Sequence, residues 1–587
     1  MTTARHVLAP APADSSRVRC ARGRKKPRAI AWFGFTAFWG HVRHLLASAI
    51  ATDSVDSRQW MIPDSPRELL GRVVAVLEPR GAKTNETLTG AFGGELWIDF
   101  VADSGDDVTV SEAVARLFSG EYEIDDPDSA DGAKLALPRG DVLILGGDLA
   151  YPVATVREMT RRLVEPWNRV LEPLVAGAKP RVLLAIPGNH DWYDGLDGFA
   201  RLCQAPCTFE DPTELTDALH PRPEENPVLA WAEAFASGET VKKPGAMALA
   251  GYVPVQHASY FRLQLARGLE LFGVDRQLRR VDPRQRSYFK SAPGAARIVL
   301  MPDPARAWGE MRPNGLATLE TIAVDPSRDP TLVLAGDTHH YERSRERKSV
   351  HVVAGGGGAF LQGARIPQRG AAYARDVEFP GPRASWTMCK RLPWHVARGG
   401  AGWIITSLCA VGDAMALYAY FRDGLHGAVV AAVVGSVLTT IATALLIGWG
   451  RHKASVVAPV SILFGLLIGA LPIALGVGAD VVGIDEIGGS RTGRVLAGAL
   501  ALVLSTFASG CAFGAMLATI ARLGLNHAQP FAALGIAGFK HFVRLRVREP
   551  RDGGPSKVDV FVIGVVDPVG GSAPVLVDRF SWPGGVQ

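Results

Sequence analysis

Short apolar runs alternate with polar, proline-rich loops between residues 90 and 375. Seven of these runs have the length and the apolar character of strands buried on both faces. They are ELWIDFVAD, DVLILGGD, RVLLAIPGNHD, ELFGVD, RIVLMPDP, TLVLAGDTHH and SVHVVAGGGG. The segment PVATVREMTRRLVEPWNRVLEPLVAG repeats apolar residues at helical spacing. Strands that alternate with helices predict an α/β domain whose sheets are covered by helices.

Four long apolar segments follow this domain. They lie near residues 403–421, 427–449, 456–478 and 495–521. About 20 apolar residues are enough to cross the hydrocarbon core of a bilayer. The last three segments are nearly free of charge, whereas the first carries Asp413. The pattern predicts an all-α transmembrane region with three or four helices over residues 400–522.

The remaining segments differ in composition from both of these regions. Residues 1–28 are rich in Ala, Pro and Arg and are predicted to form a disordered arm. Residues 29–88 are predicted to be an N-terminal helical segment, and the aromatic stretch 29–51 within it favours an interfacial helix over a core helix. Residues 526–587 regain a soluble composition. They predict a small C-terminal unit with β-strands, one of them in KVDVFVIGVVDPV.

Basic residues flank the apolar segments unevenly. If all four segments cross the membrane, one side receives Lys390, Arg391, Arg398, Arg451, Lys453 and Arg522. The other side receives Arg422, Arg491 and Arg494 together with Asp423, Asp480, Asp485 and Glu486. The more basic side of a membrane protein usually faces the cytoplasm. We therefore expect a multi-pass membrane protein whose α/β domain is cytoplasmic.

The overall composition narrows the classes of partner. The chain has 587 residues and a formal net charge of +5, and its longest basic run is RGRKKPR at residues 22–28. A nucleic-acid-binding protein usually carries a larger basic surface, so no nucleic acid is expected as a partner. The six cysteines show neither the spacing of a disulfide framework nor that of a zinc site.

Side chains that bind metals stand at the ends of four of the seven predicted strands. Asp103, Asp148, Asn189 with His190, and Asp337 with His339 hold these positions. In open α/β sheets, ligands bind outside the carboxyl ends of the strands. Oxygen and imidazole donors suit a divalent or trivalent transition metal. A single aspartate at a strand end is usually a turn or capping residue, but the combination favours a metal site.

Four motifs resemble those of the calcineurin-like metallophosphoesterase superfamily, which includes the purple acid phosphatases. They are ADSG (102–105), GDLAY (147–151), GNHD (188–191) and GDTHHYER (336–343). The resemblance implies a four-layer α-β-β-α metallophosphoesterase sandwich over residues 89–385. It also implies one or two divalent or trivalent metal ions, of manganese, iron, zinc or magnesium, that activate water to hydrolyse a phosphoester.

The resemblance further implies individual roles. Asp148 corresponds to the carboxylate that bridges two metals. Asp103 and His339 correspond to ligands of the first metal, and Asn189 to a ligand of the second. His190 corresponds to the residue that faces the phosphate and protonates the leaving oxygen, and Asp191 to the residue that orients its imidazole.

Two more residues of the last motif are candidates for substrate binding. His340 is expected to line the pocket. Arg343 either pairs with a phosphate oxygen through its planar guanidinium or forms a structural salt bridge.

Three departures from the family pattern leave the ligands, the number and the identity of the metals undecided. Gly105 stands where many relatives have a histidine, and Tyr151 either replaces that ligand or packs under the loop. Asp337 replaces a histidine of the second metal, which makes the site harder and favours manganese, iron or magnesium over zinc. Pro302 and Asp303 stand where another histidine is expected, so that either Asp303 is a ligand or the second metal is weak or absent.

The sequence therefore predicts a membrane-anchored, metal-dependent phosphoesterase. Its expected partners are membrane lipids and a phosphoester substrate, and the membrane location favours a lipid-linked one. The alternative is a non-catalytic membrane protein that binds or senses a ligand through a degenerate metallophosphoesterase site.

Overall fold

A computed structural model describes most of the chain. The described residues are 6–11, 24–33, 61–126, 133–205, 247–276, 281–290, 295–447, 454–481, 491–549 and 554–582. The predicted interfacial helix over residues 29–51 lies mostly outside these ranges.

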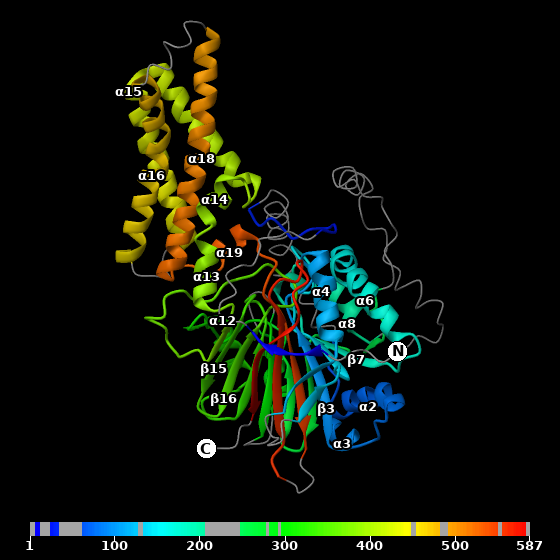
Figure 1. The fold of residues 1–587 in the computed structure, drawn as a ribbon. Helices are drawn as coiled ribbons and strands as arrows, with labels where there is room; N and C mark the ends of the chain where they lie inside the picture. The colour runs from blue at the N-terminus through cyan, green and yellow to red at the C-terminus, as the bar shows by residue number, and fades with distance from the viewer. Residues whose placement is uncertain are drawn as a thin grey trace.

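Two large β-sheets form the centre of the α/β domain (Figure 1). The eight-stranded sheet contains, in spatial order, β2 (Ala9–Pro10), β20 (Val575–Trp582), β19 (Lys557–Val565), β18 (Lys540–Arg548), β3 (Glu95–Val101), β6 (Val142–Leu145), β7 (Arg181–Ala185) and β8 (Tyr252–Pro254). The seven-stranded sheet contains β17 (Val377–Phe379), β15 (Tyr341–Glu346), β16 (Ser349–Ala354), β14 (Thr331–Ala335), β11 (Ala296–Met301), β10 (Leu269–Gly273) and β9 (Phe261–Ala266). Smaller sheets pair β1 (His6–Val7) with β4 (Tyr122–Asp125) and β5 (Lys134–Leu137), and β12 (Arg306–Ala307) with β13 (Glu310–Met311).

Alternating side chains place each large sheet between two apolar layers. In β3, Ile98 and Phe100 point into a core that both sheets share, whereas Trp97 and Val101 point to the opposite face. Successive residues of a strand face opposite sides of the sheet, so a run that is apolar at every position is buried on both. The prediction of a mixed α/β domain is confirmed.

Helices cover the outer faces of both sheets. Those around the sheets are α2 (Pro66–Leu77), α3 (Leu88–Ala91), α4 (Val108–Ser119), α5 (Val156–Met159), α6 (Glu165–Val175), α7 (Asn189–Trp192), α8 (Asp197–Cys203), α11 (Arg284–Tyr288) and α12 (Pro313–Thr321). Helices α4, α6 and α8 pack on the eight-stranded sheet, and α12 packs on the seven-stranded one. Helix α4 begins at an N-cap, because the Asp107 carboxylate accepts hydrogen bonds from the N–H groups of Thr109 and Val110.

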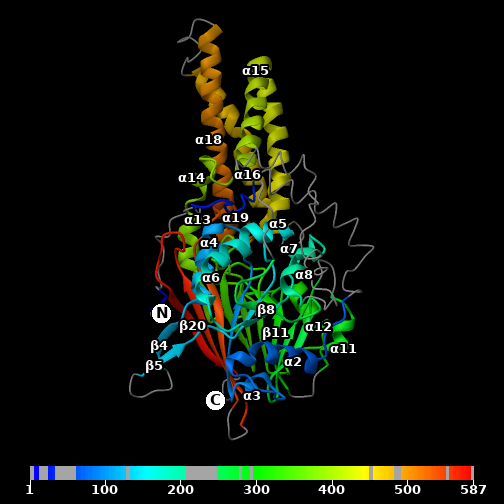
Figure 2. The same cartoon turned by 90° about the vertical axis from the view of Figure 1, so that its right-hand side faces the viewer.

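Three described helices are long and apolar enough to cross a membrane. They are α15 (Trp403–Ile447), α16 (Ala454–Val481) and α18 (Arg491–Leu523), and the shorter helices α13 (Pro382–Cys389), α14 (Leu392–Ala397) and α19 (Gln529–Leu534) lie between them and the sheets (Figures 1 and 2). Helix α15 is broken at Gly424, where φ is 60° and ψ is −147°. Glycine adopts this conformation without the steric cost that a side chain would bring.

The two halves of α15 run in opposite directions along α18. The pairs in contact are Phe421 with Gly498, Asp413 with Ser509, Thr443 with Met516, and Leu446 with Asn526. From Gly498 to Ser509 in α18, the residue numbers of the partners fall from Phe421 to Asp413, so the first half of α15 runs antiparallel to α18. From Met516 to Asn526 they rise from Thr443 to Leu446, so the second half runs parallel to it. Asp413, the one acidic residue of the first predicted segment, is buried against Ser509.

The prediction of a separate C-terminal unit is wrong. Strand β18 pairs antiparallel with β3, from Val543 opposite Phe100 to Arg548 opposite Glu95, and β19 and β20 extend the same sheet. The chain therefore leaves the domain, forms the apolar helices and returns to complete the sheet. The sequence shows that residues 557–565 are a strand, but not which strand edge they join, because every strand offers the same backbone N–H and C=O groups.

The prediction that residues 1–28 are disordered is wrong for two described parts of this arm. Residues 6–11 form β1 and β2, where the Leu8 N–H donates to the Glu123 carbonyl and the Ala11 N–H to the Leu576 carbonyl, both at 2.9 Å. The segment 24–33 also docks, since the Lys25 ammonium lies 2.7 Å from a Glu112 oxygen. The outer strands provide unpaired backbone groups that a polar arm can satisfy.

A buried ion pair holds the returning strand to the first one. Arg544 in β18 donates to both oxygens of Asp99 in β3, at 2.7 and 3.1 Å. The same guanidinium donates to the carbonyls of Phe118, Gly120 and Leu137 at 2.7 to 3.0 Å. Its charge is therefore paired and its hydrogen-bonding capacity is used, which is the condition for burying an arginine.

Arg544→Ala should destabilise the α/β domain by about 3–5 kcal/mol, because it leaves the Asp99 carboxylate buried without its partner. The neighbouring Arg546→Ala is the control. Arg546 pairs with the half-exposed Glu95, and its loss should cost about 1 kcal/mol or less. Unfolding of the two full-length variants by urea in detergent measures both values. Equal stabilities would show that the buried pair does not hold the strands together.

Candidate functional site

Three aspartates follow the carboxyl ends of β3, β6 and β14 with unusual backbone angles. Asp103, Asp148 and Asp337 have φ values of 59°, 53° and 63°. Residues other than glycine rarely adopt positive φ, and such strain concentrates at functional sites. The Asp337 N–H donates to both oxygens of the Asp103 carboxylate, at 3.0 and 3.1 Å. The strand ends of the two sheets therefore meet at these aspartates, as the motifs predict.

Asp103, Tyr151 and His339 form a cluster of three close polar atoms. The Tyr151 hydroxyl lies 3.1 Å from Asp103 Oδ1 and 3.2 Å from His339 Nε2, and Nε2 lies 3.4 Å from the same Oδ1. His339 Nδ1 donates to the Phe360 carbonyl at 2.8 Å. A carbonyl only accepts, so in the neutral imidazole Nε2 carries the lone pair that faces the other two atoms.

The Asp103/Tyr151/His339 cluster fits a cation. Two ligands of one ion, each bound at about 2.1 Å, lie about 3.0–3.4 Å apart in octahedral or tetrahedral geometry. The three measured separations fall in this range. Of these three atoms, only the Tyr151 hydroxyl carries a hydrogen, while Asp103 Oδ1 and His339 Nε2 turn lone pairs toward each other. A cation among the three atoms would relieve the repulsion between these lone pairs. Across the described parts of the chain, no group of three or more His, Cys, Asp or Glu could hold a metal ion, and this cluster depends on its tyrosine.

Further carboxylates crowd the same region. Burial raises the pKa of Asp148 well above the usual range, and the carboxylates of Asp103, Asp191 and Asp337 raise it further. Burial, then the charges of Asp303 and Asp103, raises the pKa of Asp337 in the same way. Like charges in a buried region destabilise one another unless a proton or a cation neutralises them. The raised pKa values show that these carboxylates need such a neutralising partner, and a bound cation would be one.

Asn189 and His190 lie at the start of α7, and His190 packs against Tyr151 of the Asp103/Tyr151/His339 cluster. The Asn189 side-chain amide donates to the Tyr193 hydroxyl at 3.2 Å, which leaves its carbonyl oxygen available to a cation. The His190 N–H donates to Asp148 Oδ1 at 2.8 Å, and its Nδ1 donates to the Pro152 carbonyl at 2.7 Å. The ring centroid of His190 lies 4.5 Å from that of Tyr151. His190 is thus held close to the candidate metal ligands.

Asp191 has a different role from the predicted one. Its two oxygens accept hydrogen bonds from the N–H groups of Asp148, Gly188 and Leu149, at 2.8 to 3.2 Å. Burial raises its pKa to about 7, and these backbone hydrogen bonds oppose that shift. Asp191 therefore holds the strained loop that carries Asp148, whereas the Pro152 carbonyl orients the His190 ring.

Arg343 does not bind substrate as one prediction held. Its guanidinium donates to Asp578 Oδ2 at 2.6 Å and to Asp376 Oδ2 at 2.9 Å, and it lies 4.8 Å from the ring of Phe580. These contacts join β15 to β20 across the two sheets. The alternative, a structural salt bridge, is the correct one.

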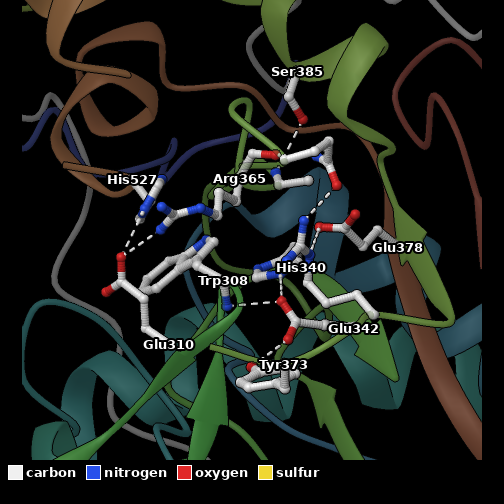
Figure 3. Close-up of polar contacts among 12 residues, drawn as sticks. Trp308, Glu310, His340, Glu342, Arg365, Tyr373, Glu378, Ser385 and His527 are labelled. Atoms are coloured by element: carbon white, nitrogen blue, oxygen red, sulfur yellow. Dashed lines mark hydrogen bonds and ion pairs between the residues drawn. The ribbon is translucent and has the colours of Figure 1, made fainter. Parts of the chain in front are cut away.

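His340 also lies away from the Asp103/Tyr151/His339 cluster. Figure 3 shows it in a second polar cluster, where its Nε2 lies 3.5 Å from Glu342 Oε2. Its ring stacks on Trp308 at 5.6 Å, and the ring of His527 stacks on the same indole at 5.3 Å. His340 has no exposed surface, so the prediction that it lines a substrate pocket is wrong. Its neighbour His339 instead lies in the Asp103/Tyr151/His339 cluster, since the chain bends at both residues before β15 begins.

Asp303 is paired with an arginine. It follows β11 and forms an ion pair with Arg276, which follows the adjacent parallel strand β10. The charges of Arg312 and Arg276 also lower the pKa of Asp337, against the larger effect of burial. Guanidinium groups thus neutralise the carboxylates at the place where the resemblance implies a second metal.

Sequence reasoning missed several residues around the site. Trp32 contacts the rings of Tyr151, His190 and Phe360, with centroids 5.5 to 6.0 Å apart. Lys540, at the start of β18, is fully buried, and its ammonium donates to the Ala359 carbonyl. Burial lowers its pKa to about 8, and the charges of Asp106 and Asp103 oppose that shift. The one signal in the sequence that could have identified Lys540 is its position as a charged residue at the start of an apolar strand.

Comparisons with known proteins give little further information. No protein-family model matches the chain. No curated protein matches it either. Among the matching solved structures is "GAP50 the anchor in the inner membrane complex of Plasmodium", at 10% identity and a TM-score of 0.28. That match covers 49% of this chain and 78% of the other. A similarity at this level indicates neither family nor function.

Asp191→Asn should cost about 1–3 kcal/mol of stability, because an amide nitrogen cannot accept and leaves a buried N–H unpaired. Asp197→Asn is the matched control. Asp197 is half exposed and pairs with Arg201 on the surface of α8, so its change should stay within about 0.5 kcal/mol. Thermal unfolding of the two detergent-solubilised variants compares them. An unchanged unfolding midpoint in Asp191→Asn would contradict its role in holding the loop.

Proposed function

We propose that the protein is a membrane-anchored, metal-dependent phosphoesterase, and that its two packed sheets form the metallophosphoesterase sandwich that its motifs resemble. The observation that supports this most is the Asp103/Tyr151/His339 cluster. Its three polar atoms have the separations of ligands around one ion. Asp103 of this cluster and the nearby Asp148 and Asp337 all have positive φ, and a strained, self-repelling group of this kind brings no benefit to the fold alone.

One cation is the expected cofactor. Asp103, Tyr151 and His339 would hold it, and the nearby carboxylate of Asp148 would help to offset its charge. A bound divalent or trivalent cation supplies Lewis acidity, which draws charge from phosphate oxygens and lowers the pKa of water. A second metal is not proposed, because the charge at Asp303 is already compensated by an arginine.

His190 is proposed as the proton donor. Its Nδ1–H is committed to the Pro152 carbonyl, so the imidazolium form, which carries a second hydrogen on Nε2, can give that proton to the leaving oxygen. In this reaction a water oxygen forms the new bond to phosphorus while the bond to the leaving oxygen breaks and that oxygen is protonated. The rings of Tyr151, Tyr193 and Trp32 lie around His190 and keep its ring in place.

We further propose that the protein crosses the membrane several times, with its α/β domain in the cytoplasm. The break at Gly424 divides α15 into two antiparallel halves, each of which is long enough to span. The described basic residues at the domain end of these helices are Lys390, Arg391, Arg398 and Arg522. At the far end, Arg422, Arg491 and Arg494 are accompanied in the sequence by Asp423, Asp480, Asp485 and Glu486. This asymmetry is typical of a cytoplasmic side.

The alternative is a non-catalytic membrane protein that binds or senses a ligand. The ion pair between Arg276 and Asp303 favours it, because that pair replaces part of the two-metal arrangement. The closeness of His190 to the Asp103/Tyr151/His339 cluster favours catalysis, since a binding site needs no proton donor there. Measuring metal content and turnover separates the two functions, since the phosphoesterase would show turnover of a phosphoester when metal is bound and the non-catalytic protein would not.

His339→Ala should abolish the binding of manganese, because it removes one of three ligands. His340→Ala is the matched control, since it removes the adjacent histidine, equally buried but in the Trp308 cluster. Elemental analysis of both purified variants after loading and desalting measures the metal per chain, with about one ion expected in the parent and in His340→Ala. Full metal content in His339→Ala would contradict the proposed ligand set.

His190→Ala should lower kcat by about 10²- to 10⁴-fold and leave the metal content intact, because it removes a proton donor and not a ligand. His257→Ala is the control, since that imidazole is exposed and pairs with Asp64 away from the site. Hydrolysis of phenyl phosphate, whose basic leaving oxygen needs a proton, by the manganese-loaded proteins gives the comparison. A substrate whose leaving group needs no proton should lose less rate, and equal rates for parent and variant would exclude the role.

A further inference from the structure

The candidate site lies at the end of the sheets that faces the apolar helices. Figure 2 shows α7, which carries Asn189 and His190, on the side of the sheets nearer to α15, α16 and α18. Helices α2 and α3, which precede β3, lie at the opposite end (Figure 2). Since β3, β6 and β7 are parallel, all their carboxyl ends point toward the membrane.

One loop connects the site to the end of the last apolar helix. Phe360 packs against the ring of His339 at 4.9 Å, and Leu361 donates its N–H to the Ile536 carbonyl. Further along the loop, Pro367 packs against Gly524, which directly follows α18. Seven residues of extended chain span at most about 25 Å. Phe360, which contacts His339 of the site, is therefore at most about this far from Pro367, which packs at the domain-side end of α18.

The surface between the site and the apolar helices has the features of a membrane interface. Trp394 and Trp403 are 53% and 58% exposed, and the guanidinium of Arg398 lies 4.1 Å from the Trp394 ring. Lys390 lies 5.6 Å from the ring of Trp386. Exposed tryptophans paired with basic residues are typical of the headgroup level of a bilayer.

This interface is also positively charged. Residues 381–403 contain Arg383, Lys390, Arg391 and Arg398 and no acidic side chain. We call these four residues the basic belt. Basic residues at the membrane surface attract anionic lipids, each by about 1 kcal/mol. The basic belt would therefore concentrate lipids that carry phosphate next to the site.

We propose that the substrate is the terminal phosphate of an anionic membrane lipid, taken from the leaflet beside α13 and α14. This inference rests on the proposed hydrolase function and adds the class of substrate. Hydrolysis would form a bond between phosphorus and a water oxygen, break the bond to the lipid oxygen and protonate that oxygen. The products are a lipid alcohol and inorganic phosphate. A soluble phosphoester lacks the contacts with the bilayer and the basic belt that raise its local concentration.

The test uses full-length, manganese-loaded protein in nanodiscs of phosphatidylcholine with about 10 mol% phosphatidic acid or a polyprenyl phosphate. Glycerol 3-phosphate and isopentenyl phosphate are the soluble counterparts, and p-nitrophenyl phosphate reports turnover without a lipid. At least one lipid should exceed its soluble counterpart by about 100-fold in kcat/KM. The lipid that does so identifies which kind of lipid supplies the phosphate.

A triple variant tests the basic belt directly. Lys390→Gln, Arg391→Gln and Arg398→Gln together should slow hydrolysis of the lipid by about 10-fold or more and leave p-nitrophenyl phosphate turnover unchanged. The control triple variant is Lys83→Gln, Arg328→Gln and Arg347→Gln. These residues are exposed and lie away from the basic belt.

The outcomes separate this inference from the proposed function. If p-nitrophenyl phosphate is hydrolysed but neither lipid exceeds its soluble counterpart, the lipid inference is wrong and the hydrolase function stands. If the metal-loaded protein hydrolyses none of the five compounds, the hydrolase function is wrong, and the inference falls with it. Equal loss of lipid hydrolysis in both triple variants would exclude the basic belt as the cause.

Discussion

The hydrogen bonds from the Asp337 backbone to the Asp103 carboxylate are the contact on which the site depends. They join the end of β14 in one sheet to the end of β3 in the other. Without this contact, the donors of the two sheets would not share one location. Both aspartates adopt positive φ, so part of the folding energy is spent in holding them there.

The rest of the domain supports this contact from a distance. Apolar side chains of both sheets fill a common core, which sets the spacing of the strand ends. Arg544 and Asp99 attach the returning β18 to β3, while Arg343 ties β15 to β20. The pieces of chain before and after the apolar helices therefore form one domain. The membrane region is an insertion into that domain, and its two ends leave and re-enter beside the site.

This topology explains why the candidate site lies at the end of the domain that carries the apolar helices. An inserted segment must leave from and return to neighbouring points of the domain, and here both points lie at the carboxyl ends of the strands (Figure 1). Phe360 touches both His339 and Trp32, and the loop that begins there packs against residues after α18. The same arrangement that completes the sheet thus places the candidate site at the end of the domain nearer to the apolar helices (Figure 2).

The sequence by itself determined the buried strands, the apolar helices and the residues at the strand ends, because burial and membrane crossing require local patterns of apolar side chains. Local motifs were enough to name Asp103, Asp148 and His339. Only the tertiary structure decided that β18 to β20 join the first sheet, that Arg343 is structural, and that His339 and His340 lie in different clusters. Those outcomes depend on contacts between distant residues, and no local pattern records which partner a backbone edge, a guanidinium or an imidazole will meet.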